Sequence, residues 1–147
     1  MSTRRVTLDA SVALRWMLDD EVDRAPALRI RDELEAGELN PIEPGHFLLE
    51  VAAGLERAHR AGRLTAAACG DALRALEVVF VERTDPFAVA ASSLALAFET
   101  GLRVADAAYL DCARRASTTL VTADRRLARA TSTADAPVVA LGDLPPL

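Results

Sequence analysis

The sequence predicts an α/β domain with three layers, in which helices cover both faces of a central parallel sheet. Short β-branched or apolar runs predict strands, and segments whose apolar residues recur at helical spacing separate them. Strands that alternate with helices form parallel sheets with both faces covered. With 147 residues, of which 51% are hydrophobic and 27% charged, the chain suits one domain over residues 1–147 and argues against disorder.

The first half of the chain is expected to contain one strand and three helices. Apolar and polar residues alternate over residues 4–8 and predict a strand, which an apolar helix over about 12–18 follows. A second helix is expected from about residue 23 to 36. The run Asn-Pro-Ile-Glu-Pro at 40–44 predicts a turn, and Pro44 suits the first turn of a helix that ends at Gly62.

The second half is expected to contain three strands and four helices. The strands are expected at residues 78–81, 118–122 and 137–141, followed by a loose tail at about 142–147. The helices are expected to open at Thr65, Asp85, Asp106 and Asp124. In the helix after Asp85, the spacing i, i+3, i+4, i+7 predicts a buried stripe formed by Ala91, Leu94, Ala95 and Phe98.

Composition and charge exclude several classes of protein. No apolar run is long enough to span a membrane, and the N-terminal segment MSTRRVTLDA lacks the apolar core of a signal peptide, so we expect a cytoplasmic protein without membrane contact. The formal net charge of -5 argues against non-specific binding to nucleic acid, although an acidic site that holds a cation still admits a phosphate. Cys69 and Cys112 have no metal-ligand spacing and are interpreted as small buried hydrophobic residues.

Four acidic residues are candidates for one site. Asp9 and Asp124 follow predicted strands, and ligand sites in parallel α/β sheets lie beyond the carboxyl ends of strands. Asp106 opens a predicted helix, and Glu50 lies at the edge of a buried helical stripe. Each acid also has an ordinary interpretation, because Asp is a favoured N-cap and a helical Glu is usually solvated. Only their convergence predicts a site for a hard divalent cation such as Mg²⁺ or Mn²⁺.

No other group of residues with obvious chemistry is present in the sequence. The chain has no P-loop, no dinucleotide-binding glycine motif, no zinc-protease motif and no nucleophile elbow. His46 lies one turn before Glu50, a spacing that suits a metal ligand. Because the sequence offers no third soft ligand, we interpret His46 as a surface histidine.

Four segments resemble, in order and spacing, motifs of the PIN-domain family and, more closely, of the VapC toxins of bacterial VapBC toxin–antitoxin pairs. They read DASVALRWML, EVAAGLERAHRAGRL, VADAAYLDCA and LVTADRRLA, and the match covers nearly the whole chain. The resemblance implies a PIN-like α/β/α fold and Mg²⁺- or Mn²⁺-dependent endoribonuclease activity. It also implies the metal-site acids Asp9, Glu50, Asp106 and Asp124, with Ser11 and Thr122 as supporting hydroxyls.

Two positions depart from the family pattern. Ala53 stands where many relatives carry Asn, and Arg125-Arg126 stand where some carry a further acid. Both departures concern the surroundings of the implied metal site rather than the four acids themselves.

The resemblance further implies three partners, namely an RNA substrate, a cognate VapB-like antitoxin and a second copy of the chain in a homodimer built from helix faces. Arginines are candidates for phosphate contacts that position RNA without reading its sequence, and they are Arg57, Arg60, Arg63, Arg125, Arg126 and Arg129. Each arginine is equally well explained as part of a solvated helix face.

Two other functions stay open at this point. A phosphatase of the haloacid-dehalogenase type also places an Asp after its first strand, but the second acid expected two residues later is Ser11 here, and the chain has no Lys. A catalytically inactive PIN-like binding module would keep the fold and lose the chemistry. The presence of all four acids argues against that module, and a metal-dependent cleavage assay distinguishes the two.

Overall fold

The computed structural model describes residues 3–80, 82–130 and 136–144, which contain a parallel sheet of five strands in the order β3-β2-β1-β4-β5. The strands are β1 (Arg4–Leu8), β2 (Leu39–Pro44), β3 (Glu82–Thr84), β4 (Thr119–Thr122) and β5 (Val138–Ala140). The helices are α1 (Ala10–Met17), α2 (Arg24–Glu35), α3 (Phe47–Arg60), α4 (Ala66–Val79), α5 (Pro86–Thr100), α6 (Val104–Ala116), α7 (Arg125–Ala130) and the 3₁₀ turn η1 (Leu141–Asp143). The predicted α/β fold with a parallel sheet is therefore confirmed.

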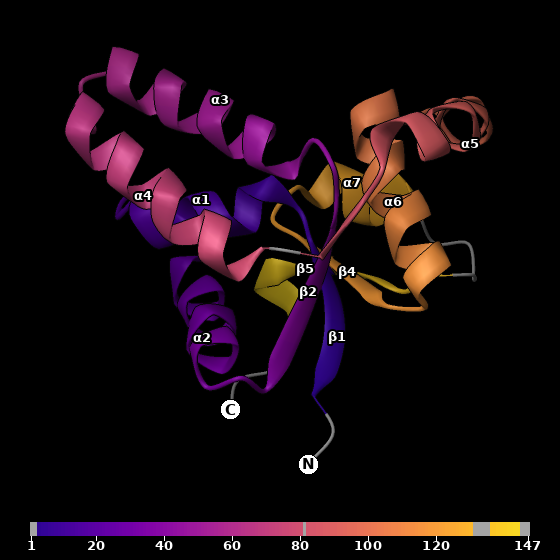
Figure 1. The fold of residues 1–147 in the computed structure, drawn as a ribbon, viewed down its shortest axis with the longest axis horizontal. Coiled ribbons are helices and arrows are strands. Elements are labelled where there is room, and N and C mark those ends of the chain that lie inside the picture. Colours follow the sequence, from indigo (N-terminus) through magenta and orange to yellow (C-terminus); the bar gives the residue numbers. More distant parts are fainter. Residues whose placement is uncertain (1–2, 81, 131–135, 145–147) are drawn as a thin grey trace.

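The helices lie in two layers on opposite sides of the sheet (Figure 1). Helices α1 to α4 connect β1, β2 and β3 and cover one face, whereas α5, α6 and α7 cover the other. This division follows from topology, because the chain steps from β1 outward to β3 and then returns to β4 and β5 on the other side of β1. Right-handed crossovers in opposite directions place their helices on opposite faces. The change of direction occurs at β1, and ligand sites form at such points.

The core fixes the helices that carry the site. Helix α6 is buried continuously from Ala107 to Ala113, because it lies between the sheet and α5. On the other face, the ring of Phe80 packs at a tilt against Phe47, with centroids 4.5 Å apart, and stacks on Trp16 at 6.0 Å. These ring contacts hold the end of α4 against α3 and α1, so both layers give the sheet rigid support.

Two local predictions are wrong because neighbouring elements decide the outcome. Residues 40–44, predicted as a turn, form most of β2, which pairs with β1 on one side and β3 on the other. The following helix therefore begins at Phe47 rather than at Pro44. Val78 and Val79, predicted as a strand, form the last turn of α4 because Phe80 packs against the aromatic core, and β3 begins at Glu82. Val81 lies outside the described residues.

The predicted buried stripe of α5 is also wrong. Leu94 and Phe98 are exposed, and the helix buries another face formed by Val89, Ser93, Leu96 and Ala97. Helix α5 is apolar on nearly every side, so periodicity does not identify the inward face. Smaller corrections concern α6, which opens at Val104 rather than Asp106, and η1, which occupies part of the expected loose tail. Residues 145–147 of that tail lie outside the described residues.

Among the described helices, none alone has the length and apolar composition needed to cross a membrane. Helices α5 and α6 pass that test only as a pair, which is bent by 108°. Cys112 is buried and Cys69 is partly buried, and both are free thiols, in agreement with their interpretation as small apolar residues.

Candidate active site

The four predicted acids come from four elements that meet at the carboxyl edge of the sheet. Asp9 follows β1 and Asp124 follows β4. Glu50 lies in the first turn of α3, and Asp106 in the first turn of α6. Burial is the largest cause of the raised pKa of Asp9, Glu50 and Asp106, and the charges of other acids in the group raise it further. The structure thus brings the four acids into one electrostatic group, and their role as metal ligands stays a prediction.

Asp9 is the most deeply buried of the four acids and is 8% exposed. Its Oδ2 accepts hydrogen bonds from the hydroxyl of Ser11 at 2.6 Å and from that of Thr122 at 2.8 Å. Burial raises its pKa, these two hydroxyls oppose the shift, and the charge of Asp124 adds to it. Although Asp9 occupies the N-cap position of α1, its side chain makes no capping hydrogen bond. Its carboxylate is therefore held by the site rather than used to cap the helix.

The two predicted hydroxyls connect Asp9 to the loop that carries Asp124. Ser11 Oγ accepts a hydrogen bond from the amide of Ala123 at 3.1 Å, and Thr122 Oγ1 accepts one from the amide of Asp124 at 3.0 Å. Each hydroxyl thus donates to Asp9 and accepts from the chain after β4. This network fixes the spacing between the ends of β1 and β4.

Asp124 also serves as a helix cap, as its ordinary interpretation predicts. Its Oδ1 accepts from the amides of Arg126 at 2.8 Å and Leu127 at 3.3 Å, both in the first turn of α7. Its Oδ2 lies 3.9 Å from the guanidinium of Arg126. Capping uses Oδ1 of Asp124, and Oδ2 makes neither of these two capping bonds.

Tyr109 is a site residue that sequence reasoning missed. It is fully buried, and its hydroxyl donates to Glu50 Oε2 at 2.6 Å. Burial raises the pKa of Glu50 and, with the charges of Glu50 and Asp9, the pKa of Tyr109, so the phenol stays a donor. The available signal was its position three residues after Asp106, since residues three apart share a helix face.

His46 is also at the site, so its interpretation as a surface histidine is wrong. Its ring meets Tyr109 edge-on with centroids 5.1 Å apart, and its Nε2 lies 3.7 Å from Glu50 Oε2. Within the described residues this buried Nε2 has no hydrogen-bond partner. The histidine therefore packs against the residue that orients Glu50.

Glu43 is a further buried acid close to the site. It lies in β2, is completely buried, and accepts the backbone N–H of Leu8 through Oε1 at 2.9 Å. Burial, and to a smaller extent the charge of Asp9, raises its pKa well above the usual range. The prediction of a turn at 40–44 concealed this residue, because an acid in a turn is normally solvated.

The predicted arginines are mostly engaged away from the acids. Arg60 pairs with Glu56, Arg63 with Asp20 and Glu21, and Arg125 with Asp143, while Arg57 and Arg129 are exposed. Arg126 and Arg103 differ, because their charges lower the pKa of Asp106. Arg103, which precedes α6, was not predicted. These two arginines are the better placed candidates for phosphate contacts.

The donor set fits a hard divalent cation. Burial and mutual repulsion make ionised carboxylates unfavourable here, and a cation between them relieves both effects. In the described part of the chain, no three His, Cys, Asp or Glu side chains stand close enough to enclose a metal ion by themselves. Mg²⁺ suits such an open arrangement, because it keeps several waters and uses only one or two carboxylates directly.

Comparisons with known proteins identify the family and the fold. The family model of the PIN domain matches residues 6–132. Ribonuclease VapC3 of Mycobacterium tuberculosis, from strains CDC 1551 / Oshkosh and ATCC 25618 / H37Rv, is 38% identical over 132 residues, which are 90% of this chain and 91% of the relative. The crystal structure of PAE2754 from Pyrobaculum aerophilum matches with a TM-score of 0.71 and 23% identity over 98% of this chain and 93% of that chain, which supports the fold alone.

Proposed function

The chain belongs to the PIN-domain family, and on this premise we propose that it is a VapC-like toxin, a Mg²⁺- or Mn²⁺-dependent endoribonuclease that hydrolyses RNA phosphodiester bonds. The observation that carries the proposal is the convergence of four acids, from four separate elements, at the carboxyl ends of β1 and β4. Three of these acids have a raised pKa because they are buried near one another, and raised carboxyl pKa values are common at functional sites.

The proposed metal-site acids are Asp9, Glu50, Asp106 and Asp124, of which one or two would bind the ion directly and the others through its waters. A cation bound there lowers the pKa of a coordinated water and neutralises charge on the phosphate. Ser11 and Thr122 hold the carboxylate of Asp9 in one orientation, and Tyr109 does the same for Glu50. The charges of Arg103 and Arg126 act on Asp106, which makes these two arginines candidates for binding a phosphate of the substrate.

The direct test is RNA cleavage by the purified chain, freed of any partner, with Mg²⁺ or Mn²⁺ and with EDTA. We expect cleavage with either metal and none with EDTA. Equal cleavage in EDTA would contradict the metal mechanism. Binding of RNA without cleavage under every condition would instead indicate an inactive binding module, and hydrolysis of p-nitrophenyl phosphate without cleavage of RNA would indicate a phosphatase.

A cognate VapB-like antitoxin is the proposed protein partner in the cytoplasm. We expect its chain to cover the four acids and to place a basic side chain among them, which would relieve their repulsion in the absence of a cation. Expression of the chain alone should arrest growth, and co-expression with the product of a short upstream reading frame should restore it. Wild-type expression without any effect on growth would remove the toxin assignment and leave the nuclease assignment standing.

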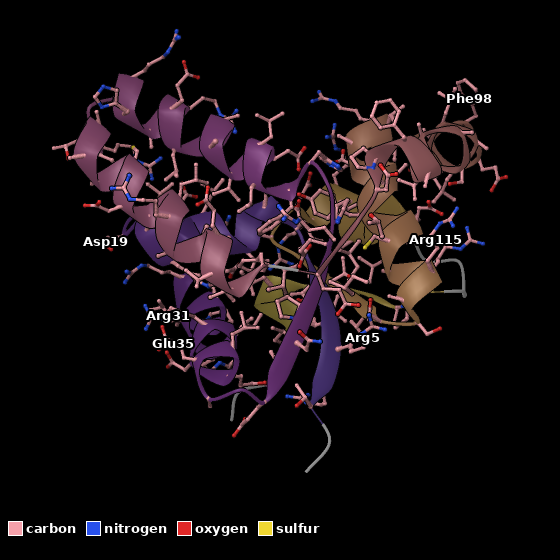
Figure 2. The ribbon with its side chains drawn as sticks, in the orientation of Figure 1. Arg5, Asp19, Arg31, Glu35, Phe98 and Arg115 are labelled. Atoms are coloured by element: carbon pink, nitrogen blue, oxygen red, sulfur yellow. The ribbon has the colours of Figure 1, made fainter. Side chains whose placement is uncertain are left out.

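A homodimer built through α5 is supported by the outer face of that helix. Phe87 is 95% exposed and Phe98 is 79% exposed, and Phe98 points away from the rest of the molecule (Figure 2). No charged residue occurs from residue 86 to 98. A second copy therefore fits this face in polarity.

A further inference from the structure

Strand β2 changes its partner along its length. Its first half pairs with β1, up to Val6 opposite Pro41, and its second half, from Ile42 to Pro44, pairs with β3. The two strands β1 and β2 therefore separate toward their carboxyl ends. This separation occurs directly beside the acid cluster, because Asp9 follows β1.

Two side chains replace the backbone pairing where the strands separate. Alternate N–H groups of β1 face β2, as that of Arg4 does when it donates to the carbonyl of Glu38 at 3.0 Å. The same alternation directs the N–H of Leu8 toward β2, where it meets Glu43 Oε1 at 2.9 Å. The carbonyl of Ile42 accepts instead from the thiol of Cys112 at 3.6 Å. Glu43 thus fills a gap between two strands with a carboxyl group.

Burying a carboxyl group between two strands is energetically unfavourable. Glu43 is fully buried, and its Oε2 has no hydrogen-bond partner among the described residues. Burial raises its pKa well above the usual range, and the charge of Asp9 raises it further. An apolar side chain would avoid the cost of burying a carboxyl group and the cost of leaving its Oε2 without a hydrogen bond. Among the described residues, the hydrogen bond that the Glu43 carboxyl gains in return is the one from the amide of Leu8.

That contact holds the residue directly before Asp9. The N–H of Leu8 is held by Glu43 on the side of β2, and the N–H of Asp9 donates to the carbonyl of Val121 at 2.9 Å on the side of β4. The end of β1 is therefore anchored from both sides. Without Glu43, the anchor toward β4 would remain and the one toward β2 would be lost.

We propose that Glu43 is a positioning residue for the metal ligand Asp9, which it fixes by accepting the amide of Leu8 in place of a neighbouring strand. This inference rests on the proposed metal site. The reach of the Glu43 oxygen matters in this role, and its acidity does not. A side chain that merely fills space would affect stability without any specific effect on metal affinity.

Three substitutions separate these roles. Glu43→Gln keeps an acceptor oxygen at the same reach, Glu43→Asp keeps the acid but withdraws it by one methylene, and Glu43→Met keeps the volume without the acceptor. We expect the Mn²⁺ affinity of the metal-free protein, measured by calorimetry, to fall about tenfold or more in the Asp and Met variants, as for other supporting partners of metal ligands. Glu43→Gln should stay within about threefold of the wild type on the same scale.

The control is Leu96→Ala, which removes a buried side chain of α5 and should lower stability without changing Mn²⁺ affinity. Amide hydrogen exchange provides a readout that needs no metal, because protection of Leu8 should fall in the Asp and Met variants and persist in the Gln variant. If the Met variant does not fold, comparison of the Gln and Asp variants still tests whether the reach of the oxygen matters.

Four outcomes overturn the inference. Wild-type Mn²⁺ affinity in Glu43→Asp would show that the contact does not position Asp9, and equal losses in Gln and Asp would show that acidity rather than reach matters. Unchanged protection of Leu8 in the Asp variant would remove the proposed anchor. A wild-type protein that binds no Mn²⁺ would contradict the proposed function itself, and the positioning role with it.

Discussion

The acid cluster and the outer face of α5 depart from the usual distribution of residues in opposite ways. The cluster buries carboxylates such as Asp9 near one another, whereas α5 exposes large apolar side chains such as Phe87 and Phe98. Each region is unfavourable in the isolated chain. Buried like charges require a cation or a basic group, and exposed hydrocarbon requires another apolar surface. The two regions therefore indicate two different kinds of partner.

The two regions also differ in how strictly they fix geometry. In the cluster, hydroxyls of Ser11, Thr122 and Tyr109 each donate to a carboxylate, so the orientation of the acids is determined by hydrogen bonds. On α5 many of the exposed side chains are apolar. Binding through them depends on the apolar area that is buried more than on the direction of any contact. A conservative substitution should therefore disable the cluster, whereas α5 should respond only to an added charge.

The largest effect is expected for Asp106→Asn. It removes one proposed ligand without changing the size of the side chain, and cleavage of RNA should fall about a thousandfold or more, because a metal ion supplies several kcal/mol of transition-state stabilisation. The matched control is Asp111→Asn on the same helix, since Asp111 contacts Ser92 and Arg115 instead of the other acids. Cleavage rates of both variants under saturating Mg²⁺ give the comparison, and equal losses would show that the charge of α6 rather than a ligand is responsible.

A charge on α5 is expected to have the next largest effect. Phe98→Glu should convert a dimer to a monomer, because each copy would lose the burial of a Phe and leave a carboxylate in the interface. The dissociation constant should rise by at least about 100-fold. Light scattering across a concentration series measures it. Val78→Glu, on the exposed side of α4, is the control and should leave the dimer intact. Dissociation by Val78→Glu alone would move the interface to α4.

The sequence identified those site residues whose position depends on local secondary structure. Asp9 and Asp124 were identifiable because each follows a strand, and hydrophobic alternation marks strands well. Tyr109 and Glu43 were not identifiable in this way. Their hydrogen bonds join residues 59 and 35 positions apart in the sequence, and contacts of this kind leave no local pattern. The fold class could be predicted because strands and helices leave local patterns in the sequence, and these long-range contacts do not.

The errors on α4 and α5 have a different physical origin. Val78 and Val79 are β-branched and favour a strand, but the contact of Phe80 with Phe47 continues the helix to this point. On α5, several faces are equally apolar, so no period distinguishes the face toward α6 from the face toward solvent. This second error is informative about partners, because a helix that is apolar on all sides needs an apolar surface against each of its faces.

Thermal stability is expected to show a smaller effect that tests the cluster alone. Saturating Mg²⁺ should stabilise the wild type by roughly 2.7 kcal/mol at a hundredfold excess over its dissociation constant. Asp9→Asn should gain much less from Mg²⁺, and its metal-free form should melt above the metal-free wild type, because one of several repelling charges is gone. Four melting curves, two proteins with EDTA and with Mg²⁺, give the answer. Indistinguishable Mg²⁺ shifts would mean that Asp9 is not a ligand.

The smallest expected effect is the pH dependence of stability, which separates the cluster from α5 because the outer face of α5 has few groups that titrate. Burial raises the pKa of Asp9, Glu50 and Asp106 in the folded chain. The folded state therefore binds more protons than the unfolded state between the ordinary carboxyl pKa of about 4 and the raised values. Stability from these groups is complete below that window and is lost as the pH rises through it.

Melting temperatures of the metal-free wild type should consequently decline through this contribution as the pH rises above the ordinary carboxyl pKa of about 4. Mg²⁺ should oppose the decline, because a cation binds the ionised carboxylates and its affinity increases as they lose their protons. The difference between the Mg²⁺ and EDTA series isolates the cluster from all other titrating groups. It should widen with pH in the wild type and in Phe98→Glu alike, and it should be much smaller in Asp9→Asn. A difference that stays constant with pH would show that these carboxylates do not bind the ion.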